Sequence, residues 1–132
     1  MAKILIVEDD PLMSRLYQKI FTFEGYAIDI ATDGVEALDK VRKDKPTLIL
    51  LDIMMPRMNG LEFLGKVKSD PDTKSIPVVI LTNLAGQQDA ERGITAGAVK
   101  YIVKSEYEPK QIANMVKEII AGYTRDEVPK TN

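Results

Sequence analysis

The chain has 132 residues, of which 45% are hydrophobic and 29% are charged, and its formal net charge is -2. This length fits one domain, and without a basic excess we expect no direct binding to nucleic acid. The sequence contains neither cysteine nor histidine, which excludes disulfides, thiolate or imidazole metal sites and Ser–His or Cys catalysis. No apolar run reaches the roughly 20 residues of a membrane span, and the N-terminus lacks the layout of a secretory signal. We therefore expect a cytoplasmic protein without membrane contact.

Short apolar runs rich in isoleucine, leucine and valine, each bounded by turn residues, predict five β-strands. In chain order they are Lys3–Val7, Tyr26–Ala31, Thr47–Leu51, Pro77–Leu81 and Val99–Val103. Apolar residues at helical spacing predict helices around residues 12–20, 35–41, 61–67 and 112–120, and a weaker pattern predicts a helix from about Gln87 to Thr95. Pro109 near the start of the last helix and Gly122 past its end mark its predicted limits.

Strict alternation of strands and helices predicts a parallel sheet covered on both faces. The first, third and fourth runs are continuously apolar, as central strands are, whereas Asp29 and Lys100 mark the second and fifth runs as edges. Right-handed crossovers then favour the strand order 2-1-3-4-5. We predict a three-layer α/β/α sandwich, a flavodoxin-like (βα)5 fold, over residues 1–122, with a polar tail or linker stub over 123–132.

Polar side chains gather where the predicted strands end. In open α/β folds, ligands bind beyond the carboxyl ends of the strands. The residues expected there are Glu8, Asp9 and Asp10 after the first strand, Asp52 after the third, Thr82 after the fourth and Lys104 after the fifth. Several carboxylates without imidazole or thiolate describe a site for a hard cation, and open positions suit Mg²⁺.

Asp52 is the central residue of this predicted site. It ends the apolar run LILLD, where burial beside other acids disfavours the charged form, so Mg²⁺ and Lys104 would keep it ionised. An ionised aspartate can attack phosphorus while a metal and an ammonium group stabilise the phosphoryl oxygens. Thr82 can donate a hydrogen bond to one of those oxygens. Asp10 precedes Pro11 and fits a helix N-cap as well as a site residue, so both interpretations stay open.

Four stretches resemble one known family. KILIVEDDPLMSR, LLDIMMPRMNGLEFL, PVVILTNLAG and GAVKYIVKS are similar, in order and spacing, to the receiver domain of two-component response regulators, the CheY-like fold, over residues 3 to about 122. The resemblance implies that Asp52 is the phospho-acceptor. It further implies an Mg²⁺ site in which Asp9 and Asp52 are direct ligands, Glu8 acts through water, and the backbone carbonyl of Met54 is the third protein ligand.

The resemblance also implies a switch. Thr82 resembles the switch hydroxyl, Tyr101 the aromatic residue whose rotamer follows it, and Lys104 the lysine that pairs with the phosphoryl group. Pro56 and Gly60 match the turn into the third helix.

Three positions depart from the commonest pattern of the family. Ser105 stands where proline usually follows the lysine. Because a cis peptide bond before serine costs about 3 kcal/mol, we expect this loop to be trans or differently shaped. Asn83 is bulkier than the small residue usual there and is placed to crowd or hydrogen-bond the phosphoryl group. Met54 offers no polar side chain to orient an attacking water, which leaves the phosphate lifetime open.

The implied function is phosphorelay signalling. A sensor histidine kinase or a histidine phosphotransfer protein presents phosphohistidine, and Asp52 attacks it in line to give an aspartyl phosphate. The added charge draws Thr82 and Lys104 inward and biases the surface of the fourth helix, fifth strand and fifth helix, which binds a downstream protein target. The protein is then a signalling phospho-acceptor that promotes its own phosphotransfer and autodephosphorylation rather than an enzyme. A phosphorylation-linked homodimer stays open.

Three alternatives belong to other classes. A flavodoxin-type electron carrier would need a phosphate-cradling loop after the first strand, where the three acids stand. A phosphatase with an aspartate nucleophile typically has a second aspartate two residues later, where Met54 stands. A degenerate receiver, acting as a protein-binding module without phosphorylation, remains the runner-up, although it would normally show a broken acidic pocket. The sequence leaves open whether the protein stands alone or is the receiver piece of a longer chain.

Overall fold

The structure, a computed structural model, describes residues 2–55 and 58–127, and side chains as far as residue 122. Its strands are β1 (Lys3–Val7), β2 (Ala27–Ala31), β3 (Leu48–Leu51), β4 (Val78–Thr82) and β5 (Lys100–Val103). They form one five-stranded sheet in the order β2-β1-β3-β4-β5, and every neighbouring pair is parallel. The predicted strand order is confirmed, with the strands that carry Asp29 and Lys100 at the two edges.

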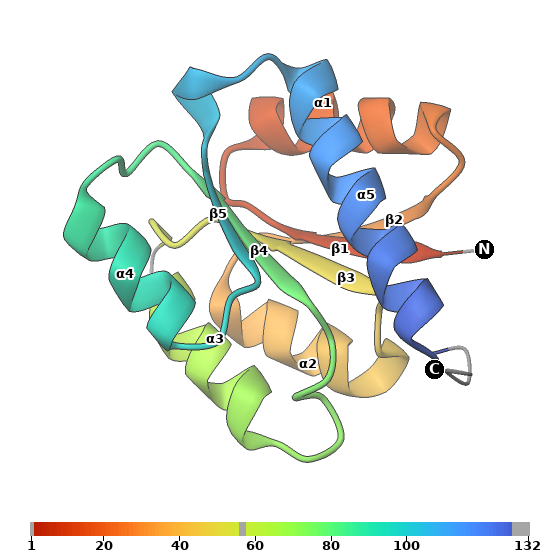
Figure 1. Cartoon of the computed structure of the whole chain (residues 1–132). Helices are drawn as coiled ribbons and strands as arrows, with labels where there is room; N and C mark the ends of the chain where they lie inside the picture. The colour runs from red at the N-terminus through yellow and green to blue at the C-terminus, as the bar shows by residue number, and fades with distance from the viewer. Residues whose placement is uncertain (1, 56–57, 128–132) are drawn as a thin grey trace.

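The helices lie on both faces of the sheet (Figure 1). They are α1 (Pro11–Phe23), α2 (Gly34–Asp44), α3 (Gly60–Ser69), α4 (Gln87–Thr95) and α5 (Pro109–Glu127), and a short 3-10 turn follows β5 at Lys104–Glu106. Helices α1 and α5 cover one face, and α2, α3 and α4 lie on the other (Figure 1). The predicted three-layer α/β/α sandwich is therefore confirmed.

The sheet separates two hydrophobic cores. Successive side chains of a strand point to opposite faces, so Ile4 and Ile6 of β1 pack in the core with α1 and α5. Leu5 and Val7 pack in the core with α2 and α3. Every residue of β3 and β4 is buried, which confirms the prediction that continuously apolar runs form central strands. These buried strands hold the carboxyl edge of the sheet in place.

Every strand bound lies within one residue of the prediction, whereas α1, α2 and α3 extend up to three residues beyond theirs. The range of β1 and the range of α4 agree with the prediction. Strand β4 begins at Val78 because Pro77 has no N–H to donate to a ladder, and it continues to Thr82, which pairs with Val103 of β5. Strand β2 begins after Tyr26, whose N–H donates instead to the carbonyl of Phe21 in the last turn of α1.

Helix α5 is longer than predicted. It runs to Glu127 instead of ending before Gly122, because a glycine inside a helix costs only about 1 kcal/mol relative to alanine. Residues 128–132 lie outside the described residues, so their interpretation as a polar tail or linker stub stays a prediction. Among the helices that the structure describes, none combines the length and apolar character needed to cross a membrane.

Candidate functional site

The sheet topology brings three carboxylates together. Glu8 directly follows β1 and Asp52 directly follows β3, and these two strands are neighbours. One carboxylate oxygen from each of Glu8, Asp9 and Asp52 lies within 4.8 Å of the others. Glu8 is 4% exposed and Asp52 is 9% exposed, whereas Asp9 faces solvent. The cluster expected from the strand ends is therefore present and open on one side.

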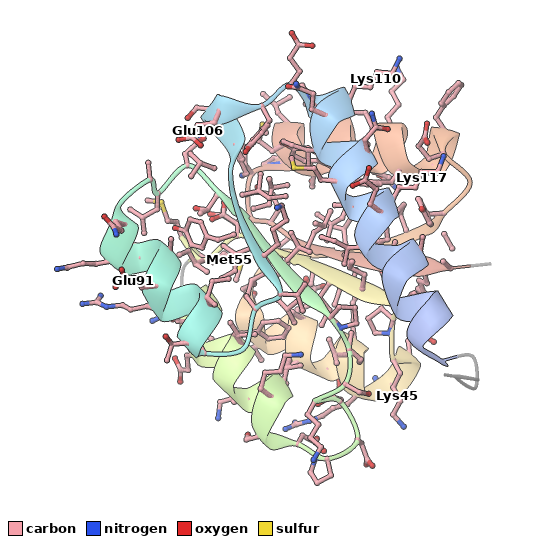
Figure 2. All side chains as sticks on the ribbon, in the orientation of Figure 1. Lys45, Met55, Glu91, Glu106, Lys110 and Lys117 are labelled. Atoms are coloured by element: carbon pink, nitrogen blue, oxygen red, sulfur yellow. The ribbon has the colours of Figure 1, made fainter. Side chains whose placement is uncertain are left out.

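Backbone hydrogen bonds continue the sheet through the first and third strand ends. The N–H of Glu8 donates to the carbonyl of Ala31 at 2.9 Å, and the N–H of Asp52 donates to the carbonyl of Val7 at 3.0 Å. The carboxylate of Asp52 is then oriented by its own loop, because Oδ1 accepts from the N–H of Met54 at 2.9 Å. The next residue, Met55, turns into the interior (Figure 2).

Lys104 forms ion pairs with two of the three carboxylates. Its Nζ lies 2.5 Å from Oε1 of Glu8 and 3.1 Å from Oδ2 of Asp52, and its side chain is 8% exposed. Burial raises the pKa of Glu8 more than the pairing with Lys104 lowers it. Burial alone would lower the pKa of Lys104, but its two carboxylate partners outweigh that effect and raise it. Lys104 therefore stays an ammonium group at neutral pH.

The donor set fits a hard divalent cation. When ionised, Glu8, Asp9 and Asp52 carry three negative charges, and Lys104 neutralises only one of them. The remaining charge matches a divalent ion, and the oxygen-only ligands match Mg²⁺. The exposed carboxylate of Asp9 leaves a side of the cluster open through which water or a phosphoryl group can complete the coordination.

Asp10 takes no part in this cluster. It is the N-cap of α1, and its Oδ1 accepts from the N–H of Leu12 at 2.9 Å. Its own N–H donates to Oε2 of Glu8 at 3.2 Å. Of the two interpretations left open for Asp10, the structure supports the helix cap. The backbone of Asp10 also helps to hold Glu8 in place.

The predicted switch residues lie beside the site. Thr82 ends β4 and is fully buried, and its Oγ1 accepts from the N–H of Leu84 at 3.4 Å. The hydroxyl of Tyr101, on β5, donates to the carbonyl of Leu84 at 2.5 Å. Asn83, between Thr82 and Leu84, is exposed. The main chain of Leu84 thus contacts both Thr82 and Tyr101.

A family model settles what kind of domain this is: the model described as the response regulator receiver domain matches residues 4–117. The chain belongs to the response regulator receiver domains. Response regulator PleD of Caulobacter vibrioides (strain NA1000 / CB15N) is 42% identical over 103 residues, which are 78% of this receiver and 23% of PleD. Response regulator MprA of Mycobacterium avium (strain 104) is 37% identical over 102 residues, 77% of this receiver and 44% of MprA. The chain spans less than half the length of these two relatives.

Solved receiver structures share the fold. The receiver domain protein (CheY-like) from Methanospirillum hungatei superposes with a TM-score of 0.87 at 29% identity, covering 96% of this chain and 98% of that one. The Mn²⁺-bound form of response regulator Rcp1 has a TM-score of 0.79 at 30% identity, with 98% of each chain covered. The predicted family and the predicted flavodoxin-like fold are both confirmed.

The described peptide bonds in the loops around the site are trans. None of the described peptide bonds is cis, so the chain continues after Lys104 through a trans bond into the turn Lys104–Glu106, as expected with Ser105 in place of proline. Met54 is exposed, and the role of its carbonyl as a ligand stays a prediction. Pro56 lies outside the described residues.

Sequence reasoning missed two contributors to this region. Leu84 acts through its N–H and carbonyl, and no sequence signal marks it because every residue except proline offers the same groups. Gly60 was matched to a turn, but its packing was not foreseen. A Cβ on Gly60 would lie 2.4 Å from Cα of Ile53 and 2.9 Å from the carbonyl of Asp52. In the sequence, this packing is marked only by the presence of Gly60 in the turn that follows the predicted acceptor Asp52.

Proposed function

We propose that this receiver accepts a phosphoryl group on Asp52 from the phosphohistidine of a sensor histidine kinase or a histidine phosphotransfer protein. The observation that carries the proposal is that Asp52 lies together with Glu8 and Asp9, with Lys104 bound to Asp52 and Glu8. Mg²⁺ would be held by Glu8, Asp9, Asp52 and the carbonyl of Met54, and when bound it would withdraw negative charge from the phosphoryl oxygens. The receiver would promote its own phosphotransfer and autodephosphorylation instead of acting on a separate substrate.

Asp52 is prepared for in-line attack. Oδ1 accepts from the N–H of Met54 and Oδ2 from Lys104. The carboxylate is therefore already oriented, and little side-chain freedom has to be lost when it attacks. Attack forms an oxygen–phosphorus bond and breaks the phosphorus–nitrogen bond of the phosphohistidine. The imidazole leaves with the electron pair of that bond. Lys104 can exchange a carboxylate partner for the new phosphoryl oxygens without a change in its own charge.

The response would spread through Thr82. Its Oγ1 accepts from the N–H of Leu84 over a long distance, 3.4 Å, and its O–H would donate to a phosphoryl oxygen on the neighbouring strand end and draw the side chain toward it. A shift of Thr82 would then move the main chain of Leu84, and with it the carbonyl that accepts the hydrogen bond from the Tyr101 hydroxyl. The proposed output surface comprises α4, β5 and α5, and the exposed side chains of Ile94 and Val99 offer it apolar area for a downstream protein or a second receiver.

Phosphorylation from a small donor tests the proposal. After incubation with acetyl phosphate and Mg²⁺, we expect intact-mass analysis to show the gain of one phosphoryl group on the wild type and none on Asp52→Asn. Hydroxylamine should remove the whole gain, and because the chain has no histidine, this lability would assign the phosphoryl group to a carboxylate. Asp39→Asn, an exposed acid of α2, serves as the matched control and should gain as much as the wild type. Equal gain on Asp52→Asn would refute the proposal.

Mg²⁺ is expected to stabilise the receiver. At a concentration ten times the dissociation constant, binding to the folded state alone adds about 1.4 kcal/mol to the free energy of unfolding. Thermal melts with and without Mg²⁺ should show this increase in the wild type. Asp9→Asn should lose most of it, whereas Asp10→Asn should keep it because asparagine also caps a helix. Loss of the Mg²⁺ response in Asp10→Asn but not in Asp9→Asn would contradict the assigned ligands.

The alternative, a receiver that binds partners without phosphorylation, would retain this fold without using the acidic cluster. The mass experiment separates the two functions, because the alternative requires that the wild type gain no phosphoryl group.

A further inference from the structure

Helix α4 packs against the sheet through a glycine. Gly93 is the single buried residue of α4, a helix that the structure describes completely. Glu91, two residues earlier, points away from the sheet into solvent (Figure 2). Contacts between α4 and β5 join the two elements. The inner face of α4 therefore approaches the sheet at the one position that has no side chain.

A side chain at position 93 would not fit. An ideal Cβ there lies 2.5 Å from Cδ1 of Ile80 and 3.1 Å from Cδ2 of Tyr101, whereas carbon atoms in contact are normally about 3.5 to 4.0 Å apart. Ile80 is fully buried in the core and has little room to move. Tyr101 is half-buried at the edge of the sheet, so its ring has a way out into solvent.

The Tyr101 ring is held in this position from its other end. Its hydroxyl donates to the carbonyl of Leu84 at 2.5 Å, and the N–H of Leu84 contacts Oγ1 of Thr82 at 3.4 Å. We define the Tyr101 packing site as the surface formed by Gly93, Ile80 and the carbonyl of Leu84. Occupation of this site by the ring is therefore coupled, through a single residue, to the position of the Thr82 hydroxyl.

We propose that Gly93 is a positioning residue for Tyr101: the missing side chain at position 93 is what allows the ring to lie in its packing site with its hydroxyl on Leu84. A methyl group at this position displaces the ring toward solvent. The consequence at Asp52 rests on the proposed function. If the packed ring favours a phosphoryl group at Asp52, displacing the ring must weaken the binding of a phosphoryl mimic there, because coupling between two sites is reciprocal.

Helix propensity must be separated from packing in any test. Alanine favours a helix interior over glycine, so Gly93→Ala also stiffens α4 whatever happens to Tyr101. Gly65→Ala in α3 is the matched control, because a Cβ on Gly65 meets nothing within 4 Å. The double variant Gly93→Ala/Ile80→Val removes Cδ1 of Ile80 and makes space for the new methyl group. It should return the ring to its packing site.

The first measurement follows the ring itself. The chain contains five tyrosines, and fluorine NMR of protein labelled with 3-fluorotyrosine can follow each, with Tyr101→Phe identifying the Tyr101 signal. In Gly93→Ala we expect this signal to move to the position and solvent-isotope shift of an exposed tyrosine. It should stay unchanged in Gly65→Ala and return in Gly93→Ala/Ile80→Val. An unchanged signal in folded Gly93→Ala, or the same change in Gly65→Ala, overturns the proposal.

The second measurement follows the coupling to Asp52. We expect beryllofluoride with Mg²⁺, a phosphoryl mimic, to bind Gly93→Ala about fivefold or more weakly than the wild type, a factor in the usual range of allosteric coupling. Gly65→Ala should bind it as the wild type does. Equal binding in Gly93→Ala despite a displaced ring overturns the coupling alone. Absence of binding in the wild type overturns the proposed function and the coupling together, and the fluorine signal still decides the role of Gly93.

Discussion

Lys104→Met is expected to lower the free energy of unfolding by about 3 kcal/mol at neutral pH without Mg²⁺, because removing one partner of a buried ion pair leaves uncompensated charge. The lysine lies between the carboxylates of Glu8 and Asp52, and methionine keeps most of its volume. Urea denaturation measures the loss. Lys117→Met is the matched control, since Lys117 is 60% exposed beside Glu24, and an exposed ion pair of this kind contributes at most about 1 kcal/mol.

The loss of stability in Lys104→Met should depend on pH. Burial raises the pKa of Glu8 in the folded protein, so ionised Glu8 opposes folding. That cost is absent below the pKa of the unfolded chain and grows as the pH rises through the folded value. Removing Lys104 takes away the partner that lowers the pKa of Glu8, so the deficit should widen from weakly acidic to neutral pH. Added Mg²⁺, or the second substitution Glu8→Gln, should reduce it. A deficit that is constant over this pH range would argue against an electrostatic origin.

Gly60→Ala is expected to destabilise the fold by roughly 3 kcal/mol, at the upper end of what overpacking costs. Gly60 begins α3, and its N–H donates to the carbonyl of Ile53 at 3.2 Å. The added Cβ would meet Cα of Ile53 and the carbonyl of Asp52, both main-chain atoms that cannot rotate away. The loop that carries Asp52 must therefore shift, and phosphorylation from acetyl phosphate should slow by at least about tenfold, since misplacing a reacting group by 1 Å can cost about a hundredfold.

Gly65→Ala, five residues later in α3, isolates the effect of the contact. Its Cβ enters open space, so it should leave phosphorylation unchanged and stabilise the protein by up to about 1 kcal/mol. Chemical denaturation and the rate of mass gain measure both variants. A Gly60→Ala protein as stable as the wild type would show that the start of α3 can shift to accommodate the methyl group without moving Asp52.

The architecture could be predicted from the sequence because the apolar and charged residues of each strand indicate whether it lies at the centre or at the edge of the sheet. A strand buried on both faces cannot carry a charge in its middle, so Asp29 and Lys100 marked the edges, and strict alternation left few topologies for the rest. The site followed from the topology, because residues after neighbouring parallel strands must meet at one edge of the sheet. The convergence of Glu8, Asp9 and Asp52 needed nothing beyond that.

Other features depend on three-dimensional packing and leave no local pattern. Lys104 was expected beside Asp52, but its second pairing, with Glu8, depends on the direction of a long side chain after an edge strand. The contacts of Leu84 use main-chain atoms alone. Gly122 read as a helix end, but a glycine in an otherwise favourable helix does not have to stop it, and α5 continues to Glu127.

Helix α4 is attached to the sheet more weakly than the elements that hold the acidic cluster. A helix that buries only a glycine, and whose N-cap Gly86 makes no side-chain cap bond, is held to the sheet by little apolar area. Movement of α4 bears on Ile80 and Tyr101, the two residues that Gly93 faces, while β1 and β3, which precede Glu8 and Asp52, stay packed in the cores of the other helices. A partner that grips α4 works against a small restoring force, while the strands beneath keep the acidic cluster assembled.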